Sequence, residues 1–162
     1  MKKNEYSFSY EVYDSIDDLE KNDALLLDKA RKVTEQAYAP YSHFKVGAVA
    51  KMKNGEMVAG ANQENASFPA GLCAERVLLG AASSLYPGMP IDTIAISYNP
   101  ENGDSDQPIS PCGICRQSLQ EFETRVEHPV RLILAGMEGK VFIIPDANML
   151  LPLAFTKKEL KG

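Results

Sequence analysis

The fold is decided by the stretch from Ile91 to Ala135, which begins with IDTIAISY (residues 91–98) and ends with VRLILA (residues 130–135). Both ends are short apolar runs with β-branched residues, which is typical of buried strands. Between them, residues 112–124 have a helical pattern. A strand, a helix and a second strand in this order predict a parallel crossover. The chain is therefore expected to be an α/β protein.

Residues on both sides of this unit extend the predicted sheet. Apolar residues alternate from Val46 to Met52, and Met57 to Ala61 runs back as the second strand of a hairpin. Between them, Asn54-Gly55 predicts a tight turn in which both residues have positive φ. Val141 to Ile144 is a further strand. Together these runs predict a mixed sheet.

Two further helices are predicted from their apolar stripes. The first begins at Asn22, with Asn22 or Asp23 as its cap, and ends by Ala39 because Pro40 follows. The second runs from about Ala74 to Leu85. The apolar positions of the two stripes are Leu26, Ala30, Val33 and Ala37, and then Ala74, Val77, Leu78, Ala81, Ala82 and Leu85. We expect a three-layer α-β-α sandwich around a central mixed five-stranded sheet.

Length and composition limit the number of domains and the kinds of partner. The chain has 162 residues, 44% of them hydrophobic and 24% charged, which suits one globular domain. We expect this domain to span residues 23–162, after an extension of residues 1–22 that forms an edge strand or an arm. The net charge is −5, and the 17 Lys and Arg residues are scattered, so we expect no nucleic-acid partner. No run approaches the roughly 20 apolar residues of a membrane span. We therefore expect no membrane association and a cytoplasmic location.

Three cysteines are the residues that carry chemistry. An odd number argues against a disulfide framework, so these thiols are free, bound to a metal or catalytic. Cys112 and Cys115 form a Cys-x-x-Cys pair at the start of a predicted helix, where residues i and i+3 share a face. Such a pair is typical of a metal site and also of a redox dithiol. Cys73 considered alone is equally compatible with a buried core thiol.

The residues that follow Cys73 favour a catalytic metal site. Three thiolates leave one position of a tetrahedral zinc ion open to water, which is the arrangement of a catalytic site. Glu75, two residues after Cys73, is placed to exchange protons with that water, and Arg76 can donate a hydrogen bond to a thiolate. All three cysteines are expected at helix N-termini, which stabilise anions.

The ordered set of motifs resembles the zinc-dependent cytidine deaminases, in the all-cysteine branch that forms homotetramers. The resemblance extends from about residue 24 to residue 155. The matching segments are YAPYS (38–42), FKVGA (44–48), NQENAS (62–67), CAER (73–76) and PCGICRQ (111–117). It implies a cytidine deaminase-like fold and hydrolysis of free cytidine and 2'-deoxycytidine to uridine, 2'-deoxyuridine and ammonia, a reaction of pyrimidine salvage. It further implies one zinc ion per subunit, held by Cys73, Cys112 and Cys115.

The resemblance also implies a role for each site residue. Glu75 would move protons between the attacking water, the pyrimidine ring nitrogen and the leaving amino group. The backbone N–H of Ala74 would bind the ring carbonyl oxygen, and the backbone carbonyl of Ser110 would bind the leaving amine. Four further residues would bind the nucleoside: Asn62 and Glu64 at the ribose hydroxyl, Phe44 along the pocket, and Phe155 from a neighbouring subunit over the base.

Alternatives remain for several of these residues. Phe44 and Phe155 could be core residues, and Asn62 and Glu64 could be turn residues. Phe68 stands where many relatives have a tyrosine, which removes a hydroxyl that can reach the 5' end of the nucleoside. The residues to which we assign no site role are His43, His128, Arg116 and Gln117.

Alternatives remain for the activity as well. The close rival is deamination of another small compound such as blasticidin S. A polynucleotide deaminase is disfavoured by the acidic charge balance. From a different class, a non-catalytic zinc module would need a fourth ligand and would leave Glu75 unexplained.

Overall fold

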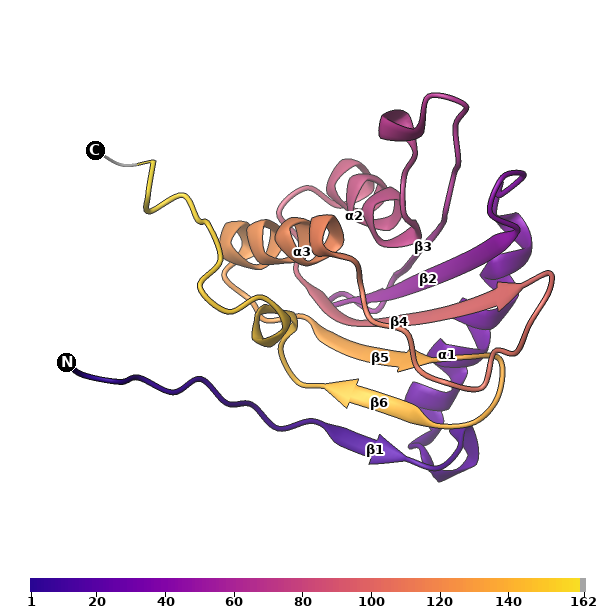
Figure 1. Cartoon of the computed structure of the whole chain (residues 1–162), viewed down its shortest axis with the longest axis horizontal. Coiled ribbons are helices and arrows are strands. Elements are labelled where there is room, and N and C mark those ends of the chain that lie inside the picture. Colours follow the sequence, from indigo (N-terminus) through magenta and orange to yellow (C-terminus); the bar gives the residue numbers. More distant parts are fainter. Residues whose placement is uncertain (161–162) are drawn as a thin grey trace.

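The computed structural model describes residues 1–160, which form a mixed six-stranded sheet with helices on both faces (Figure 1). The sheet order is β1-β6-β5-β4-β2-β3. The strands are β1 (Glu11–Tyr13), β2 (Phe44–Met52), β3 (Met57–Ala61), β4 (Ile91–Pro100), β5 (Arg131–Ala135) and β6 (Val141–Ile144). The helices are α1 (Lys21–Val33), α2 (Ala74–Leu85) and α3 (Gly113–Val126). Short 3-10 helices lie at 16–18, 34–36, 68–70 and 147–150.

The predicted crossover and hairpin are both present. β4 pairs with β5 in parallel, with Ile94 opposite Leu132, and α3 makes the connection between them. β2 and β3 pair antiparallel. The prediction that Asn54 has a positive φ is wrong, because only Gly55 has one, at 89°. The N–H of Gly55 bonds to Met52 O, so the connection is a three-residue loop with glycine in the left-handed position.

The N-terminal region differs from expectation in two places. The described sheet has six strands, whereas five are expected from the sequence. The sixth is the edge strand β1, which lies in the extension of residues 1–22 and pairs antiparallel with β6. The prediction that α1 begins at Asn22 under an Asn22 or Asp23 cap is wrong, since the helix begins at Lys21. Asp23 instead forms a two-pronged ion pair with Arg131 of β5, at 2.9 and 2.6 Å. Asp23 therefore forms a long-range ion pair and does not cap the helix.

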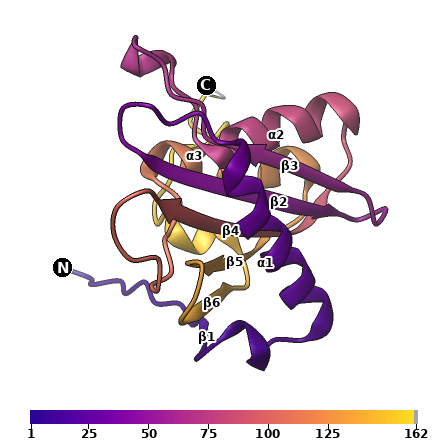
Figure 2. The same cartoon turned by 90° about the vertical axis from the view of Figure 1, so that its right-hand side faces the viewer.

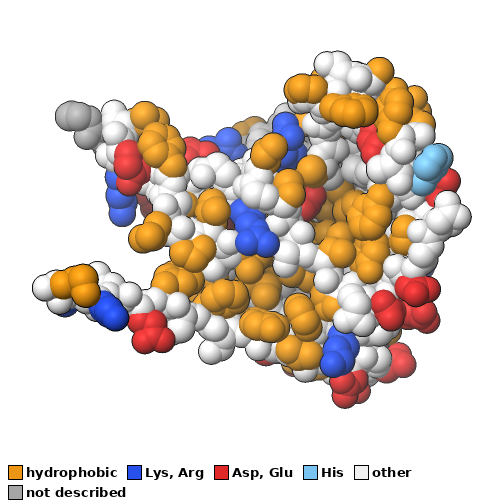
Figure 3. Space-filling view, in the orientation of Figure 1, with side chains coloured by type: hydrophobic (Ala, Val, Ile, Leu, Met, Phe, Trp, Pro, Cys, Tyr) orange, Lys and Arg blue, Asp and Glu red, His pale blue; other side chains and the backbone are white. Residues whose placement is uncertain are grey.

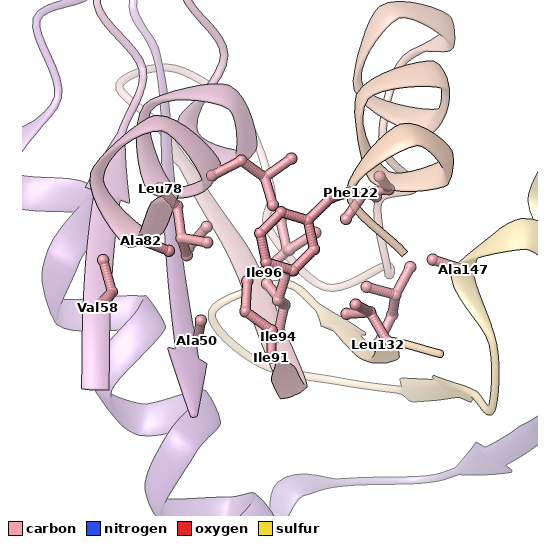
Figure 4. Close-up of a cluster of buried hydrophobic side chains, with 14 of the residues drawn as sticks. Ala50, Val58, Leu78, Ala82, Ile91, Ile94, Ile96, Phe122, Leu132 and Ala147 are labelled. Atoms are coloured by element: carbon pink, nitrogen blue, oxygen red, sulfur yellow. The ribbon is translucent and has the colours of Figure 1, made fainter. Parts of the chain in front are cut away.

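The alternation of side chains along the strands sorts the core into two layers. Leu132 and Leu134 of β5 face the cluster under α2 and α3, whereas Ile133 faces the cluster under α1. Figure 4 shows Leu78 of α2 and Phe122 of α3 converging on β4. Figure 2 shows α1 apart from the other two helices. The predicted three-layer sandwich is confirmed.

Two details of the apolar stripes are corrected. In α2, Leu85 is 66% exposed and Leu79 is buried in its place. The helix α1 ends at Val33 and the chain continues as a 3-10 helix that ends at Gln36, although Ala37 still packs against the same cluster as Leu26, Ala30 and Val33. Between residues 1 and 160, no helix is both long and apolar enough to span a membrane.

Candidate active site

The sulfur atoms of the three cysteines lie together where α2 and α3 begin. Cys73 and Cys112 are the residues immediately before the two helices, and Cys115 lies in the first turn of α3. The Sγ of Cys112 is 3.7 Å from that of Cys73 and 3.4 Å from that of Cys115. All three sulfur atoms lie within 4.8 Å of one another, and no disulfide joins them.

This geometry fits a tetrahedral zinc ion. Sulfur ligands about 2.3 Å from zinc, at tetrahedral angles, lie about 3.8 Å from one another, which is close to the spacing of these sulfur atoms. Within the described part of the chain, the cluster contains no fourth His, Cys or carboxylate ligand. Three protein ligands and one open position are the arrangement of a catalytic zinc site rather than a structural one.

The surroundings of the cluster favour the thiolate at Cys73 and the thiol at Cys115. Hydrogen bonds from Cys115 and Cys112, together with the positive charge of Arg76, lower the pKa of Cys73 to about 6. The pKa of Cys115 is raised by its hydrogen bond to Cys73 and by burial. The cluster thus shares its protons unequally, with Cys73 ionised first. Between residues 1 and 160, no hydrogen bond from the Arg76 side chain to a sulfur atom is present, so Arg76 acts here through its charge.

Glu75 lies beside the cluster in the first turn of α2 and is only 5% exposed. Burial raises the pKa of its carboxyl, and the charge of Cys73 raises it further. Glu75 lines a cavity, so its carboxyl is hidden from bulk solvent but can be reached by a molecule in that cavity. A group that both accepts and donates a proton needs such a setting.

A cavity of about 780 Å³ opens over the cysteines and Glu75. Figure 3 shows hydrophobic side chains around this hollow, beneath the projecting segment that precedes α2. The predicted residues that line it are Phe44, Asn62, Glu64, Cys73, Ala74, Glu75, Ser110 and Cys112. Three predicted residues lie elsewhere: Cys115 is buried, Arg76 lines a separate groove between α2 and α3, and Phe155 lies at the surface. The volume suits a small organic molecule.

Phe155 does not line the cavity of its own chain. Its ring is 58% exposed, and its carbonyl accepts a hydrogen bond of 2.9 Å from the Gln117 side chain. The residue is therefore neither the core residue of the alternative interpretation nor a wall of this cavity. Its ring is presented at the surface.

Asn62 and Glu64 are both held by the backbone and keep hydrogen-bonding capacity. Asn62 accepts from the Val46 N–H at 2.7 Å and donates to the Phe44 carbonyl at 2.9 Å, which leaves one amide hydrogen. Glu64 Oε2 accepts from the N–H groups of Tyr41 and Ser42 at 2.9 and 3.2 Å, which leaves Oε1. Hydrogen bonds from Ser42 and Tyr41 hold the pKa of Glu64 below its usual range, so the carboxylate remains an acceptor.

Aromatic side chains form one wall and the mouth of the cavity. Phe44 stacks on the buried ring of Tyr98, with centroids 5.1 Å apart, so its orientation is fixed. At the mouth, Phe68 meets Tyr41 edge to face at 5.8 Å. Tyr41 belongs to the matching segment YAPYS and has no predicted role, but it lines the cavity. Leu72 and Ile109, which also line it, carried no signal in the sequence.

Ser110 and Cys112 lie at the end of the loop between β4 and α3. This loop is held in place by the turn between β5 and β6. Ser105 Oγ accepts a hydrogen bond from the Met137 N–H at 2.9 Å, and Ser105 O accepts one from the Glu138 N–H at 3.0 Å. A Cβ at Gly136 would lie only 2.1 Å from Ser105 O, so no larger residue fits there without movement of the loop. This loop between β4 and α3 is therefore anchored, and Ser105 is buried.

Arg116 and His43, which have no predicted site role, hold separate segments of the chain together. Arg116 donates to the carbonyls of Pro111 and Leu150, at 2.8 and 2.9 Å, and so ties both the cysteine loop and the C-terminal segment to α3. His43 Nδ1 lies 2.8 Å from Glu101. Neither histidine belongs to the cysteine cluster, as expected.

Comparison with known proteins gives a consistent result. The model of the cytidine and deoxycytidylate deaminase zinc-binding region matches residues 20–128. A cytidine deaminase of Halalkalibacterium halodurans is 37% identical over 136 residues, which are 84% of this chain and 96% of that protein. The crystal structure of cytidine deaminase from Burkholderia pseudomallei has a TM-score of 0.70 at 38% identity, covering 81% of this chain and 97% of that chain. A blasticidin-S deaminase of Bacillus cereus is 28% identical over 142 residues, 86% of this chain and 96% of that protein.

Proposed function

The chain belongs to the cytidine and deoxycytidylate deaminase family, and we propose that it hydrolyses free cytidine and 2'-deoxycytidine to uridine and 2'-deoxyuridine with release of ammonia. The observation that carries the proposal is the convergence of three cysteine sulfur atoms and the buried Glu75 at one cavity. The reaction serves pyrimidine salvage. The match to the blasticidin-S deaminase at lower identity keeps that compound as a second substrate to test.

Cys73, Cys112 and Cys115 hold the zinc ion of the enzyme, one per subunit. When bound, zinc supplies Lewis acidity, which makes water acidic enough to act as a nucleophile near neutral pH. The N-termini of α2 and α3 stabilise negative charge at the cysteines, and the charge of Arg76 stabilises the thiolate of Cys73. Arg76 is thus a positioning residue, which acts on the substrate only through the sulfur ligands.

Glu75 is the catalytic acid and base. It takes the proton of the attacking water, passes it to the pyrimidine ring nitrogen, and then helps the amino group leave. The new C–O bond forms at the ring carbon whose C–N bond breaks, so water and cytidine become uridine and ammonia. Its place on the cavity wall, in the first turn of α2, supports this role.

Backbone groups at the cavity orient the pyrimidine ring. The Ala74 N–H binds the ring carbonyl oxygen, and the Ser110 carbonyl accepts from the leaving amine. Support comes from two backbone groups that can still form a hydrogen bond. Within residues 1–160, neither the Ala74 N–H nor the Ser110 carbonyl has a backbone hydrogen-bond partner. Ala74 begins α2, where N–H groups have no helical acceptor.

Side chains bind the nucleoside at its other parts. The remaining amide hydrogen of Asn62 and the free Oε1 of Glu64 bind the ribose hydroxyl, and Phe44 packs along the nucleoside. Phe68 has no hydroxyl, so the 5' end of the nucleoside loses one neutral hydrogen bond, worth about 1 kcal/mol.

We place the enzyme in a homotetramer with shared active sites, in which Phe155 of each subunit covers the base bound by a neighbour. Its surface position outside its own cavity supports this assembly. We also take residues 23–162 as the catalytic domain and residues 1–22 as an extension. A site of three reduced thiols supports a cytoplasmic location, where thiols stay reduced.

The test is the change in ultraviolet absorbance when cytidine, deoxycytidine or blasticidin S is added to the zinc-loaded wild type. We expect both nucleosides to be turned over and blasticidin S to be turned over slowly or not at all. Glu75→Gln should bind zinc and be almost inactive. The matched control is Glu123→Gln, which alters a buried glutamate of α3 that does not line the cavity.

Each other outcome has a clear meaning. Rapid turnover of blasticidin S without turnover of nucleosides would replace the proposed substrate and keep the proposed chemistry. Full zinc content with no ammonia released from any of the three compounds would identify a non-catalytic zinc module.

A further inference from the structure

The N-terminal arm, residues 2–13, is an extended segment with one aromatic face. Tyr6, Phe8, Tyr10 and Val12 alternate with Ser7, Ser9 and Glu11. Ring centroids follow one another at 6.5 Å from Tyr6 to Phe8, 6.1 Å to Tyr10 and 5.0 Å to Phe142 of β6. In this chain these large side chains remain 39–53% exposed. An alternating pattern of this kind belongs to a strand with one face against protein.

The same segment presents an open backbone edge. β1 is the outermost strand, paired only with β6 on its inner side. Among the described residues, no backbone group of residues 2–13 bonds to another strand on the outer side. Figure 1 shows the chain before β1 continuing past the end of β6, where the Tyr6 hydroxyl donates a hydrogen bond of 2.9 Å to Met149 O. A free edge next to exposed aromatic side chains is a template for strand addition.

We propose that the arms of two copies of this chain pair antiparallel across a twofold axis and join their sheets edge to edge. The axis passes between the two Ser7 residues, so that residues whose numbers sum to 14 lie opposite one another. An even sum keeps each aromatic face on the same side of the combined sheet. The contact is isologous, as a twofold axis requires.

Charge selects this register. It places Lys3 opposite Glu11 twice, once on each side of the axis, and Tyr6 opposite Phe8 on the aromatic face. Glu11 Oε2 accepts a hydrogen bond of 2.6 Å from the Tyr13 hydroxyl, which leaves Oε1 for the lysine. A shift to the next even register, with a sum of 16, would place Glu5 opposite Glu11, where like charges repel. Opposite charges and cross-strand aromatic pairs therefore favour one register.

The inference does not depend on the proposed function. The arm lies before residue 20, where the match to the deaminase zinc-binding region begins, and none of its residues lines the active-site cavity. A failure of arm pairing would leave the assignment of the active site unchanged.

The direct test is disulfide cross-linking in the full-length, zinc-loaded chain carrying Ser7→Cys. In the proposed register the two introduced thiols face each other at the axis, so mild oxidation should give a covalent dimer on a non-reducing gel. The matched control is Ser9→Cys, because two copies of residue 9 lie about 13 Å apart along the paired strands. The wild type controls for cross-linking through its own cysteines. Equal yields at positions 7 and 9, or no dimer from Ser7→Cys, would overturn the proposal.

Charge reversal tests the register independently. Adding Lys3→Glu to Ser7→Cys creates two like-charge pairs and should lower the yield of dimer about tenfold. Adding Lys3→Glu and Glu11→Lys together restores two opposite-charge pairs and should return the yield to that of Ser7→Cys. A double exchange that yields no more dimer than Lys3→Glu would refute the register.

Discussion

Two buried glutamates on helices of the same face show what distinguishes a reactive carboxyl from a structural one. Glu75 lies in the first turn of α2 and is 5% exposed, and Glu123 lies near the end of α3 and is 3% exposed. Burial raises the pKa of both, that of Glu123 to about 7. Glu75 opens onto a cavity beside three cysteines, whereas Glu123 accepts a 2.7 Å hydrogen bond from the Val130 N–H and lines no described cavity. Access to a cavity and to the cysteine cluster, not burial, therefore distinguishes the proposed catalytic carboxyl from the other one.

The largest expected effect separates the two carboxyls by activity. Glu75→Gln should lower kcat for cytidine about 10³-fold or more, because the variant has no group to move the proton. Glu123→Gln should leave kcat within about twofold. Zinc content measured on the same samples should be unchanged in both variants. A comparable loss of kcat in the two variants would contradict the role of Glu75 as the group that moves the proton.

The second prediction concerns the loop that brings Cys112 to Glu75. Gly136→Ala should force this loop away from the turn, because the added carbon would meet the Ser105 backbone. We expect kcat/KM to fall about 10- to 100-fold, since small displacements of reacting groups are costly. Gly80→Ala in α2 is the control, because nothing lies within 4 Å of its Cβ position and it should not reduce activity. An unaltered kcat/KM in Gly136→Ala would show that the anchored loop does not position the site.

The third prediction separates charge near the sulfur atoms from charge elsewhere in the same groove. Arg76→Ala should keep zinc and lose about 10- to 100-fold in kcat, because a group that supports the metal ligands is removed. Arg125→Ala changes the other arginine of the groove, which lies over Phe122 and bonds to Ser83, and should keep activity. Unchanged turnover in Arg76→Ala would remove its positioning role.

The smallest expected effect concerns the free energy of unfolding and its dependence on the buried carboxyl of Glu123. Because the folded pKa of Glu123 is raised above its usual value of 4.5 to about 7, folding favours the protonated form. Its stabilising contribution is complete below about pH 4.5 and is lost as the pH rises through 7. Glu123→Gln, a neutral isostere, should therefore raise the free energy of unfolding at pH 8 by about 1–2 kcal/mol and change it little at pH 4.5.

Denaturant unfolding at both pH values checks this difference. Glu121→Gln is the control, because Glu121 is exposed on the same helix and should show no such pH dependence. An equal effect of Glu123→Gln at the two pH values would mean that its carboxyl does not titrate with folding.

Much of the fold could be predicted because the signals were local. The apolar runs of β4 and β5 and the glycine of the β2–β3 turn each determine their own structure. The pairing of Asp23 with Arg131 could not be predicted in this way, because the two residues are 108 positions apart. The short strand β1 likewise depends on the edge that β6 offers.

The site divides in the same manner. Spacing predicted the pairing of Cys112 with Cys115 and of Cys73 with Glu75, each at one helix start. That the two helix starts meet followed from the family resemblance, because Cys73 and Cys112 are 39 positions apart. The sequence gives no sign that Ser105 and Gly136 anchor the loop before Cys112, because this anchoring depends on contact between two distant turns. The position of Phe155 relative to its own cavity also required the folded chain.

The most direct test of the central claim is turnover of cytidine by the zinc-loaded protein in ¹⁸O-labelled water. If the three cysteines and Glu75 form a hydrolytic deaminase site, each molecule of uridine should carry one labelled oxygen, and one molecule of ammonia should be released with it. Removal of zinc should stop both, and its return should restore both. Zinc-loaded protein that releases no ammonia from cytidine, or forms uridine without the label, would contradict the account.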